Sequence, residues 1–334
     1  MHITMRKARR VCVWTIAVAV MASSTTVATT AAHAAVSPCE AMQVVAHEDD
    51  DLLFMNPDIY NQINAGKCSV TVFVTDGRGE PTIRNRQRGI QDAYRLMANV
   101  SDLNNQDEWT GRLLTFGGKQ VEEYVLRDRP NVKLVFMNLA DNAPASGDVS
   151  IRSLWESGTA VTTTGIPCQD ESGSSSCQSL VQQRFTYNHD GLLQTLAAVM
   201  GYYGPTTIRL QDTVPADPNR GYIEDHQDHV ATAKFAEAAT RRYGDASGTR
   251  ANLVYYRDYN IQNVPENLVS WARDVKRNAF LNQYMPLNPP AQAYVNSGWT
   301  ERMYYRWARG TSWVGRNADG RIQVFAVRDG EVFT

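Results

Sequence analysis

Short apolar segments alternate with longer amphipathic segments through most of the chain. Five short segments are β-branched or apolar and are typical of buried strands: residues 42–46, 69–75, 132–137, 207–210 and 252–256. Four longer segments have the apolar spacing of helices: residues 85–98, 178–203, 227–243 and 267–283. Strands that alternate with helices predict an α/β fold, in which a mostly parallel sheet has helices on both faces.

The first 34 residues depart from this pattern. Residues 1–10 carry four cations and no acid, residues 11–22 are apolar except for Thr15, and residues 32–34 read Ala-His-Ala. This order predicts a secretory signal peptide that is cut after about Ala34, and therefore a secreted, extracellular protein. An uncleaved N-terminal anchor is the alternative, although the apolar run is short for a bilayer span. After cleavage, no remaining segment is predicted to span a membrane.

The C-terminal residues 310–334 also differ from the alternating region. Asp-Gly pairs separate short alternating runs in TSWVGRNADGRIQVFAVRDGEVFT, which predicts β-hairpins. The tail resembles the opening of a repeat unit from secreted lectin-type β-propellers, but one unit cannot form a propeller. We therefore expect three parts: a signal peptide at 1–34, a main domain at 35–309 and a short β-rich tail at 310–334.

Charge and cysteine content narrow the class of protein. Removing the four cations of the leader changes the net charge from −2 to −6, and no basic cluster remains, which argues against a nucleic-acid partner. Four cysteines remain, and an even number in an exported chain predicts two disulfides. We favour Cys39–Cys68, because both precede neighbouring predicted strands, and Cys168–Cys177, which bracket a polar loop. A zinc–thiolate site is the alternative, but the chain has no C-x-x-C.

The candidate chemistry lies at the carboxyl ends of the predicted strands, where active groups gather in parallel sheets. The first strand runs into AHEDDD at residues 46–51, Asp76 follows the second strand, and Asp212 follows a later one. Four adjacent carboxylates between apolar segments repel one another, so we expect a positively charged partner beside them. The spacing of an EF-hand calcium loop is absent.

A second histidine-rich stretch begins the predicted helix at residues 227–243. Asp225 is a plausible N-cap, and His226 and His229 are one turn apart on one helix face. An isolated H-x-x-H is more often a solvated pair at a helix end. Two imidazoles together with a carboxylate from His47-x-x-Asp50 are, however, the ligand set of a catalytic zinc site with one open position.

These motifs resemble the PIG-L/LmbE-like deacetylases. AHEDDDLLFMNP with a later HQDH is similar to the family's A-H-P-D-D-E and H-x-D-H, and VFVTDGRGE is similar to its T-x-G segment. RQRGIQDAYRLMANV resembles the R-x-x-G-x-x-x-A-Y-x-x-M-A helix of secreted actinobacterial members. The resemblance spans roughly residues 42–285. It implies a Rossmann-like fold and zinc-dependent hydrolysis of an N-acetyl group on a glucosamine unit, giving a free amine and acetate.

The resemblance also implies roles for individual residues. His47, Asp50 and His229 would bind Zn²⁺. Asp49 would be the general base that activates water, and His226 would polarise the carbonyl and stabilise the oxyanion. Weaker expectations for substrate contacts fall on three residues: Arg88, Asp212 and Arg78.

Departures from the family pattern leave the substrate open. Glu48 replaces a proline, Asp51 replaces a glutamate, and Arg78 stands where the T-x-G segment continues with an acid, so Arg78 or Glu80 can alter which acyl-sugar fits. Candidate substrates are cell-wall fragments, glycopeptides and other N-acetylglucosaminyl conjugates. The alternative function is a carbohydrate-binding protein with a non-catalytic site. Arg84, Arg86 and Arg88 form a basic helix start that could face an anionic substrate or the solvent.

Overall fold

The structure is a computed structural model. It describes residues 38–76, 82–101, 108–141, 149–164, 180–181, 183–214, 225–287, 297–307, 312–316, 322–328 and 331–333. The predicted leader, Arg78, Cys168 and Cys177 lie outside these residues. Within them, no helix is long and apolar enough to cross a membrane.

The described residues contain a central mixed sheet of eight strands in the order β10-β9-β8-β1-β2-β5-β4-β3. The strands that pair in parallel are β1 (Ala41–Val45), β2 (Ser69–Thr75), β5 (Val132–Leu139), β8 (Thr207–Gln211) and β9 (Asn252–Tyr256). The antiparallel strands at the two edges are β3 (Trp109–Phe116), β4 (Lys119–Leu126) and β10 (Tyr305–Trp307). Strands β1, β2 and β5 are buried along their whole length, as their nearly continuous apolar sequences predict.

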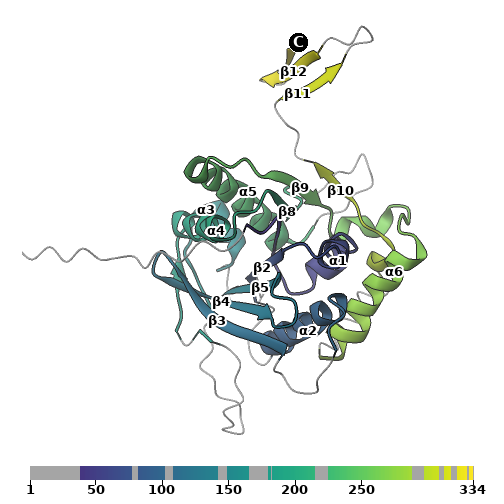
Figure 1. Ribbon diagram of the computed structural model, residues 1–334. Helices are drawn as coiled ribbons and strands as arrows, with labels where there is room; N and C mark the ends of the chain where they lie inside the picture. The colour runs from purple at the N-terminus through teal and green to yellow at the C-terminus, as the bar shows by residue number, and fades with distance from the viewer. Residues whose placement is uncertain are drawn as a thin grey trace, which may run out of the picture. The chain divides into compact units, whose positions relative to one another are not determined.

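Helices cover both faces of this sheet (Figure 1). On one face lie α3 (Ile151–Ser157), α4 (His189–Tyr203) and α5 (Gln227–Ser247). On the other lie α1 (Asp58–Asn64), α2 (Thr82–Met97) and α6 (Ser270–Arg277). Shorter helical segments are η1 (Asp51–Met55), η4 (Tyr259–Asn263), η5 (Asn278–Tyr284), η6 (Met285–Leu287) and η8 (Trp299–Glu301). Two separate apolar cores result, one on each side of the sheet, and the predicted α/β class is confirmed.

The five predicted strands are all present, with ends that differ by at most two residues from the predictions. The predicted helix at 178–203 is wrong in its first part, because α4 begins only at His189. The side chain of Asn188 caps it by accepting a hydrogen bond from Gly191 N. Before that cap, Thr186–Tyr187 forms the short strand β7, which pairs with β6 (Val161–Thr162).

The hairpin of β3 and β4 was not predicted from the sequence. Its turn is Gly117-Gly118, and both glycines have positive φ, 58° and 78°. Two residues with positive φ give the turn whose twist matches a two-residue hairpin, and glycine adopts this conformation most easily. The Gly-Gly pair was therefore the available signal for these strands.

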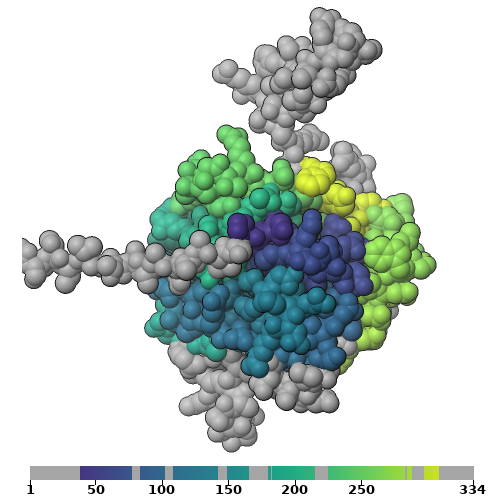
Figure 2. Space-filling model, in the orientation of Figure 1, coloured from purple at the N-terminus to yellow at the C-terminus, as the bar shows by residue number. Residues whose placement is uncertain are grey.

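Strand β1 lies between β2 and β8, so the chain leaves the centre of the sheet in one direction and later returns on the other side. Such a switch point leaves a crevice at the carboxyl ends of the strands. Gln211 joins β8 to β1 there, because its Oε1 accepts a hydrogen bond from Ala46 N at 2.8 Å. At the opposite ends of β1 and β2, a disulfide links Cys39 to Cys68. The start of the described chain, purple in Figure 2, lies at the molecular surface.

A second, three-stranded antiparallel sheet lies in the C-terminal tail, formed by β11 (Ser312–Arg316), β12 (Ile322–Arg328) and β13 (Glu331–Phe333). The hairpins predicted from the Asp-Gly pairs are therefore present. The resemblance of the tail to a propeller repeat stays a prediction.

Candidate metal centre and active site

The acid run after β1 folds inward because apolar residues on both sides of it are buried. β1 ends at Val45, and every residue of the π-helix η1, which begins at Asp51, is buried. Glu48, Asp49 and Asp50 are at most 6% exposed. Four carboxylates are thus inside the protein, where each needs a cation or a hydrogen-bond donor.

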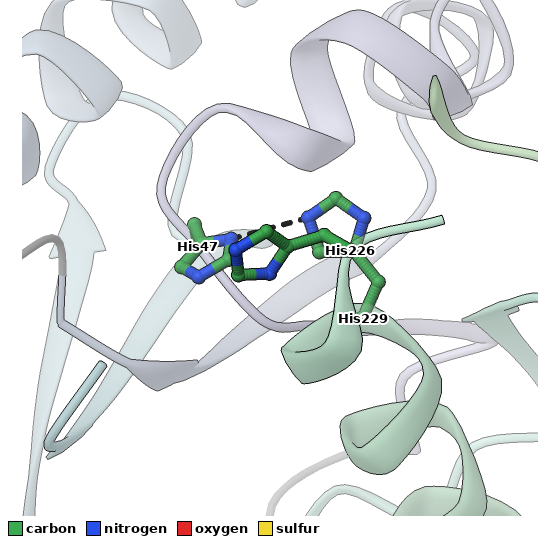
Figure 3. Close-up of side chains that lie close together, drawn as sticks. All are labelled: His47, His226 and His229. Atoms are coloured by element: carbon green, nitrogen blue, oxygen red, sulfur yellow. Dashed lines mark hydrogen bonds between the residues drawn. The ribbon is translucent and has the colours of Figure 1, made fainter. Parts of the chain in front are cut away.

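Asp50 lies between two imidazoles, that of His47 in the same turn and that of His229 in the first turn of α5. Its Oδ2 is 3.4 Å from His47 Nδ1, and its Oδ1 is 3.0 Å from His229 Nε2. These two ring nitrogens are 3.2 Å apart, as the dashed line in Figure 3 marks. Ligands placed tetrahedrally at about 2.0–2.1 Å from zinc are about 3.3–3.4 Å from one another. The three donors therefore fit one divalent cation.

The outer nitrogen of His47 faces two further carboxylates. His47 Nε2 is 3.2 Å from Asp141 Oδ1 and 3.8 Å from Asp228 Oδ2. Asp141 follows β5, and its backbone N donates to Asp76 Oδ1 at 3.4 Å, so the ends of β2 and β5 are connected here. A carboxylate on the outer nitrogen holds the proton there and leaves the lone pair of Nδ1 directed toward Asp50.

The same arrangement recurs behind His229. Its Nδ1 is 3.0 Å from Asp225 Oδ1 and 3.5 Å from Asp258 Oδ2. Asn260 Nδ2 donates to the other oxygen of Asp225 at 3.1 Å and fixes that carboxylate. The imidazoles of His47 and His229 are thus each oriented by nearby carboxylates, as protein sites orient a metal-binding histidine.

Three residue sets in the described chain could hold a metal: His47, His226 and His229; His47, Asp141 and Asp228; and Asp225, His229 and Asp258. The last two sets use the outer nitrogens, which the carboxylates already occupy as hydrogen-bond partners. A further set, the inner nitrogens of His47 and His229 with Asp50, brings two imidazoles and a carboxylate within 3.4 Å of one another. We therefore favour that set as the candidate site.

His47 Nδ1, Asp50 and His229 Nε2 are called the inner set below. The pKa values of these residues indicate a place for positive charge. Burial lowers the pKa of His47, but Asp50, Asp141 and Asp228 outweigh burial and hold the pKa well above 6.5. The pKa of His229 is raised in the same way, against burial, by Asp50 first. Burial raises the pKa of Asp50, and the two imidazoles reverse this and hold it well below its usual value. A divalent cation would supply the charge that protons on the imidazoles otherwise provide.

Asp49 lies beside the ligands but contacts a different group. Arg86 Nη2 donates to Asp49 Oδ1 at 3.0 Å, and Arg86 Nε is 3.2 Å from Glu48 Oε2. Burial raises the pKa of Asp49, and Arg86 acts in the opposite direction without cancelling the effect. Burial likewise raises the pKa of Glu48 to about 8. A carboxylate with a raised pKa is a stronger base than an exposed one, which suits general-base catalysis.

His226, and not Asp225, is the N-cap of α5, so the predicted cap is wrong. His226 Nδ1 accepts a hydrogen bond from Asp228 N at 3.3 Å, while Asp225 is held by His229. The ring centroid of His226 is 5.0 Å from that of His47 and 5.1 Å from that of His229, and the three rings lie close together in Figure 3. Burial and then the two other imidazoles lower the pKa of His226 to about 3, so it is neutral at pH 7.

A family model described as GlcNAc-PI de-N-acetylase, PIG-L, matches residues 42–240, more than half of the chain. The chain belongs to the PIG-L family. Membership supports a de-N-acetylase activity. No curated protein matches the chain.

Solved structures similar to this PIG-L chain share little sequence with it. N,N′-diacetylchitobiose deacetylase from Pyrococcus horikoshii is 12% identical, with a TM-score of 0.40 over 80% of this chain and 83% of that one. The 4-carboxy-2-hydroxymuconate hydratase from Pseudomonas putida is 12% identical, with a TM-score of 0.41 over 83% and 99%. A conserved protein from Thermus thermophilus is 12% identical, with a TM-score of 0.42 over 78% and 84%. These values carry no argument about reaction or substrate, so the family match alone decides the assignment.

Two positions of the PIG-L signature differ in this chain, and the structure places both. Glu48, in place of proline, lies against Arg86. Asp51, in place of glutamate, points away from the ligands, and its Oδ2 accepts a hydrogen bond from Tyr94 OH at 2.5 Å. Burial raises the pKa of Asp51 to about 7. Tyr94 OH is also 2.6 Å from Thr71 Oγ1, so Asp51 joins the loop to β2 and α2.

The residues expected to contact substrate are not gathered at the metal centre. Arg88 is exposed on α2, and Arg78 lies outside the described residues. Asp212 is 2% exposed and pairs with Arg306 at 2.7 Å and with Arg257 at 3.2 Å. Arg86 is the cation of the helix start that reaches the acids. Two residues rotate an α-helix by about 200°, so Arg86 and Arg88 face nearly opposite directions.

Asp141 and Asp258 were missed in the sequence. Each follows the carboxyl end of a parallel strand, β5 and β9 respectively. The rule that drew attention to Asp76 and Asp212 would have found them as well.

Proposed function

We propose that this chain is an exported, zinc-dependent hydrolase that removes the N-acetyl group from a GlcNAc-containing glycoconjugate. The observation that carries the proposal is the convergence of His47, Asp50 and His229 within 3.4 Å of one another, with Asp49 next to them. Family membership supports the reaction, and the leader-like residues 1–34 support export.

The inner set would hold the metal, through His47 Nδ1, Asp50 and His229 Nε2. A bound Zn²⁺ supplies Lewis acidity toward an amide carbonyl and lowers the pKa of water to about 7. Asp141 and Asp225 keep the two imidazoles in the tautomers that such binding requires.

Asp49 is suited to move the proton of the reaction. Its carboxylate takes a proton from the attacking water, whose oxygen forms the new bond to the acetyl carbon. The same proton is then available for the amine nitrogen as the C–N bond breaks, so that acetate and a free amine leave. Arg86 holds one oxygen of Asp49, which leaves the other for this proton.

His226 is suited to stabilise the negative charge on the carbonyl oxygen. Because its Nδ1 accepts a hydrogen bond from Asp228 N, the proton of the neutral ring is on Nε2. The pKa of about 3 keeps the ring neutral at pH 7, so Nε2 remains a hydrogen-bond donor. A placed donor of this kind typically contributes about 10²–10³ in kcat.

The test is acetate release by the chain without its leader. We expect acetate and the corresponding free amine, identified by mass spectrometry, from at least one member of a panel of GlcNAc conjugates when Zn²⁺ is present. Chelation should abolish release, and added Zn²⁺ should restore it. Asp190→Asn is a suitable control, because Asp190 is an exposed acid on α4 that pairs with Arg242. Saturable binding of a GlcNAc glycan with no acetate under full zinc loading would instead establish a binding protein.

A further inference from the structure

Glu48 is a buried acid without an assigned role, at the position where the PIG-L signature has proline. It is fully buried, between the ligand His47 and the base Asp49 in sequence. Within the described residues, neither of its oxygens has a side-chain hydrogen bond, and its Oε2 forms an ion pair with Arg86 Nε at 3.2 Å. Burying a carboxyl is costly unless a cation or a donor lies against it, and Arg86 is the cation that lies against Glu48.

Arg86 contacts both acids with different atoms. Nε faces Glu48 at 3.2 Å, while Nη2 donates to Asp49 at 3.0 Å. The side chain begins in the first turns of α2 and is 16% exposed. An arginine side chain has high rotamer entropy, so each added contact restricts the orientation of its plane. A second contact at Nε fixes the plane, and with it the direction from which Nη2 meets Asp49.

We infer that Glu48 is a positioning residue for the general base, which it orients through Arg86. The inference rests on the proposed function for its kinetic consequence, but the Glu48–Arg86–Asp49 connection is a property of the chain itself. Without Glu48, Arg86 loses the contact at Nε and can either leave Asp49 or rotate so that two nitrogens engage it. In both cases the free oxygen of Asp49 no longer faces the same point. Misplacement of a catalytic group by about 1 Å costs on the order of 10²-fold in rate.

Two variants separate the contact between Glu48 and Arg86 from the volume that the Glu48 side chain fills. Glu48→Leu substitutes an apolar side chain of similar size and removes the oxygen that lies against Arg86. Glu48→Gln keeps a polar oxygen at that place. We expect kcat to fall about tenfold to hundredfold in the Leu variant with KM within about twofold, and to recover most of the loss in the Gln variant. Full metal content and an unchanged far-UV spectrum confirm folding of each variant.

A double-mutant cycle decides whether Glu48 acts through Arg86. If it does, Glu48→Leu combined with Arg86→Ala lowers kcat no further than Arg86→Ala alone. If kcat of the double variant instead falls by the product of the two single-variant losses, Glu48 acts independently of Arg86 and the inference is overturned. The matched control is Glu123→Gln, since Glu123 is another buried acid paired with an arginine, Arg112, on the distant hairpin strands β3 and β4. It should leave kcat and KM unchanged.

A second readout does not depend on activity. In full-length protein labelled with ¹⁵N-arginine, the Nε–H of Arg86, assigned by its loss in Arg86→Lys, should exchange slowly with water. Exchange should be at least about tenfold faster in Glu48→Leu and unchanged in Glu123→Gln. Equal exchange rates in Glu48→Leu and wild type would overturn the inference even if the wild type deacetylates sugars. Conversely, absence of deacetylation with the expected exchange rates would refute the proposed function and leave the connection standing.

Discussion

Replacing Asp225 by asparagine removes the charge behind the outer nitrogen of His229 while preserving the shape of the side chain. Asp225 Oδ1 is 3.0 Å from His229 Nδ1, and its other oxygen is fixed by Asn260. Loss of such a partner typically lowers metal affinity 10- to 100-fold. Asp258 is also 3.5 Å from the same nitrogen and retains one carboxylate there. We therefore expect the lower limit, about tenfold, or about 1.4 kcal/mol.

The assay is competition for Zn²⁺ between the protein and a chromophoric chelator at fixed pH and ionic strength. The double variant Asp225→Asn, Asp258→Asn removes both carboxylates and should weaken binding by about hundredfold, or about 2.7 kcal/mol. Asp190→Asn is the control, since Asp190 has 57% of its side chain exposed and lies on another helix.

Two results would refute this reasoning. An affinity of the single variant within twofold of wild type would mean that the acids behind His229 do not set its strength as a ligand. A loss as large as that of His229→Ala would mean that Asp225 itself binds the metal, in the set Asp225, His229 and Asp258.

Three further predictions concern catalysis and stability. Asp49→Asn should retain full zinc content while kcat falls by about 10²–10⁴, because it removes the proton acceptor but no ligand; unchanged acetate release would exclude Asp49 as the base. The metal-free protein should lose stability as pH rises from about 4 to 8, because burial gives Asp51 a pKa of about 7 and Glu48 one of about 8, so the folded state holds protons that the unfolded chain has released. Melting temperatures in chelator across this range test it, Asp51→Asn should flatten the curve, and a rise of stability with pH would contradict the assignment. Replacing Cys39 and Cys68 together by serine should lower the free energy of unfolding by about 3–4 kcal/mol, because the disulfide closes a loop with a sequence separation of 29. Denaturant titration measures this, and an unchanged midpoint would show that the bond does not form in the folded protein.

The residues of the candidate site were accessible from the sequence to different degrees. His47, Asp50, His226 and His229 stand out because they form two compact motifs, and the resemblance to a family connects them. Asp141 and Asp258 are single acids after strands, without a motif, and their significance depends on contact with imidazoles from other segments. Arg86 is the arginine of the R-x-x-G pattern, but its contacts with Glu48 and Asp49, and the different direction of Arg88, depend on how α2 packs.

The sequence by itself determined the five parallel strands, most of the longer helices and the identity of the two motifs, because periodicity and residue type are local properties. Only the tertiary structure decided how the four adjacent acids are used, since their directions depend on which element packs over each one. Glu48 and Asp49 meet Arg86, Asp50 meets two imidazoles, and Asp51 meets Tyr94. Burial then gives these chemically similar carboxylates different pKa values, and a buried charge is governed by its nearest partners, which chain order does not specify.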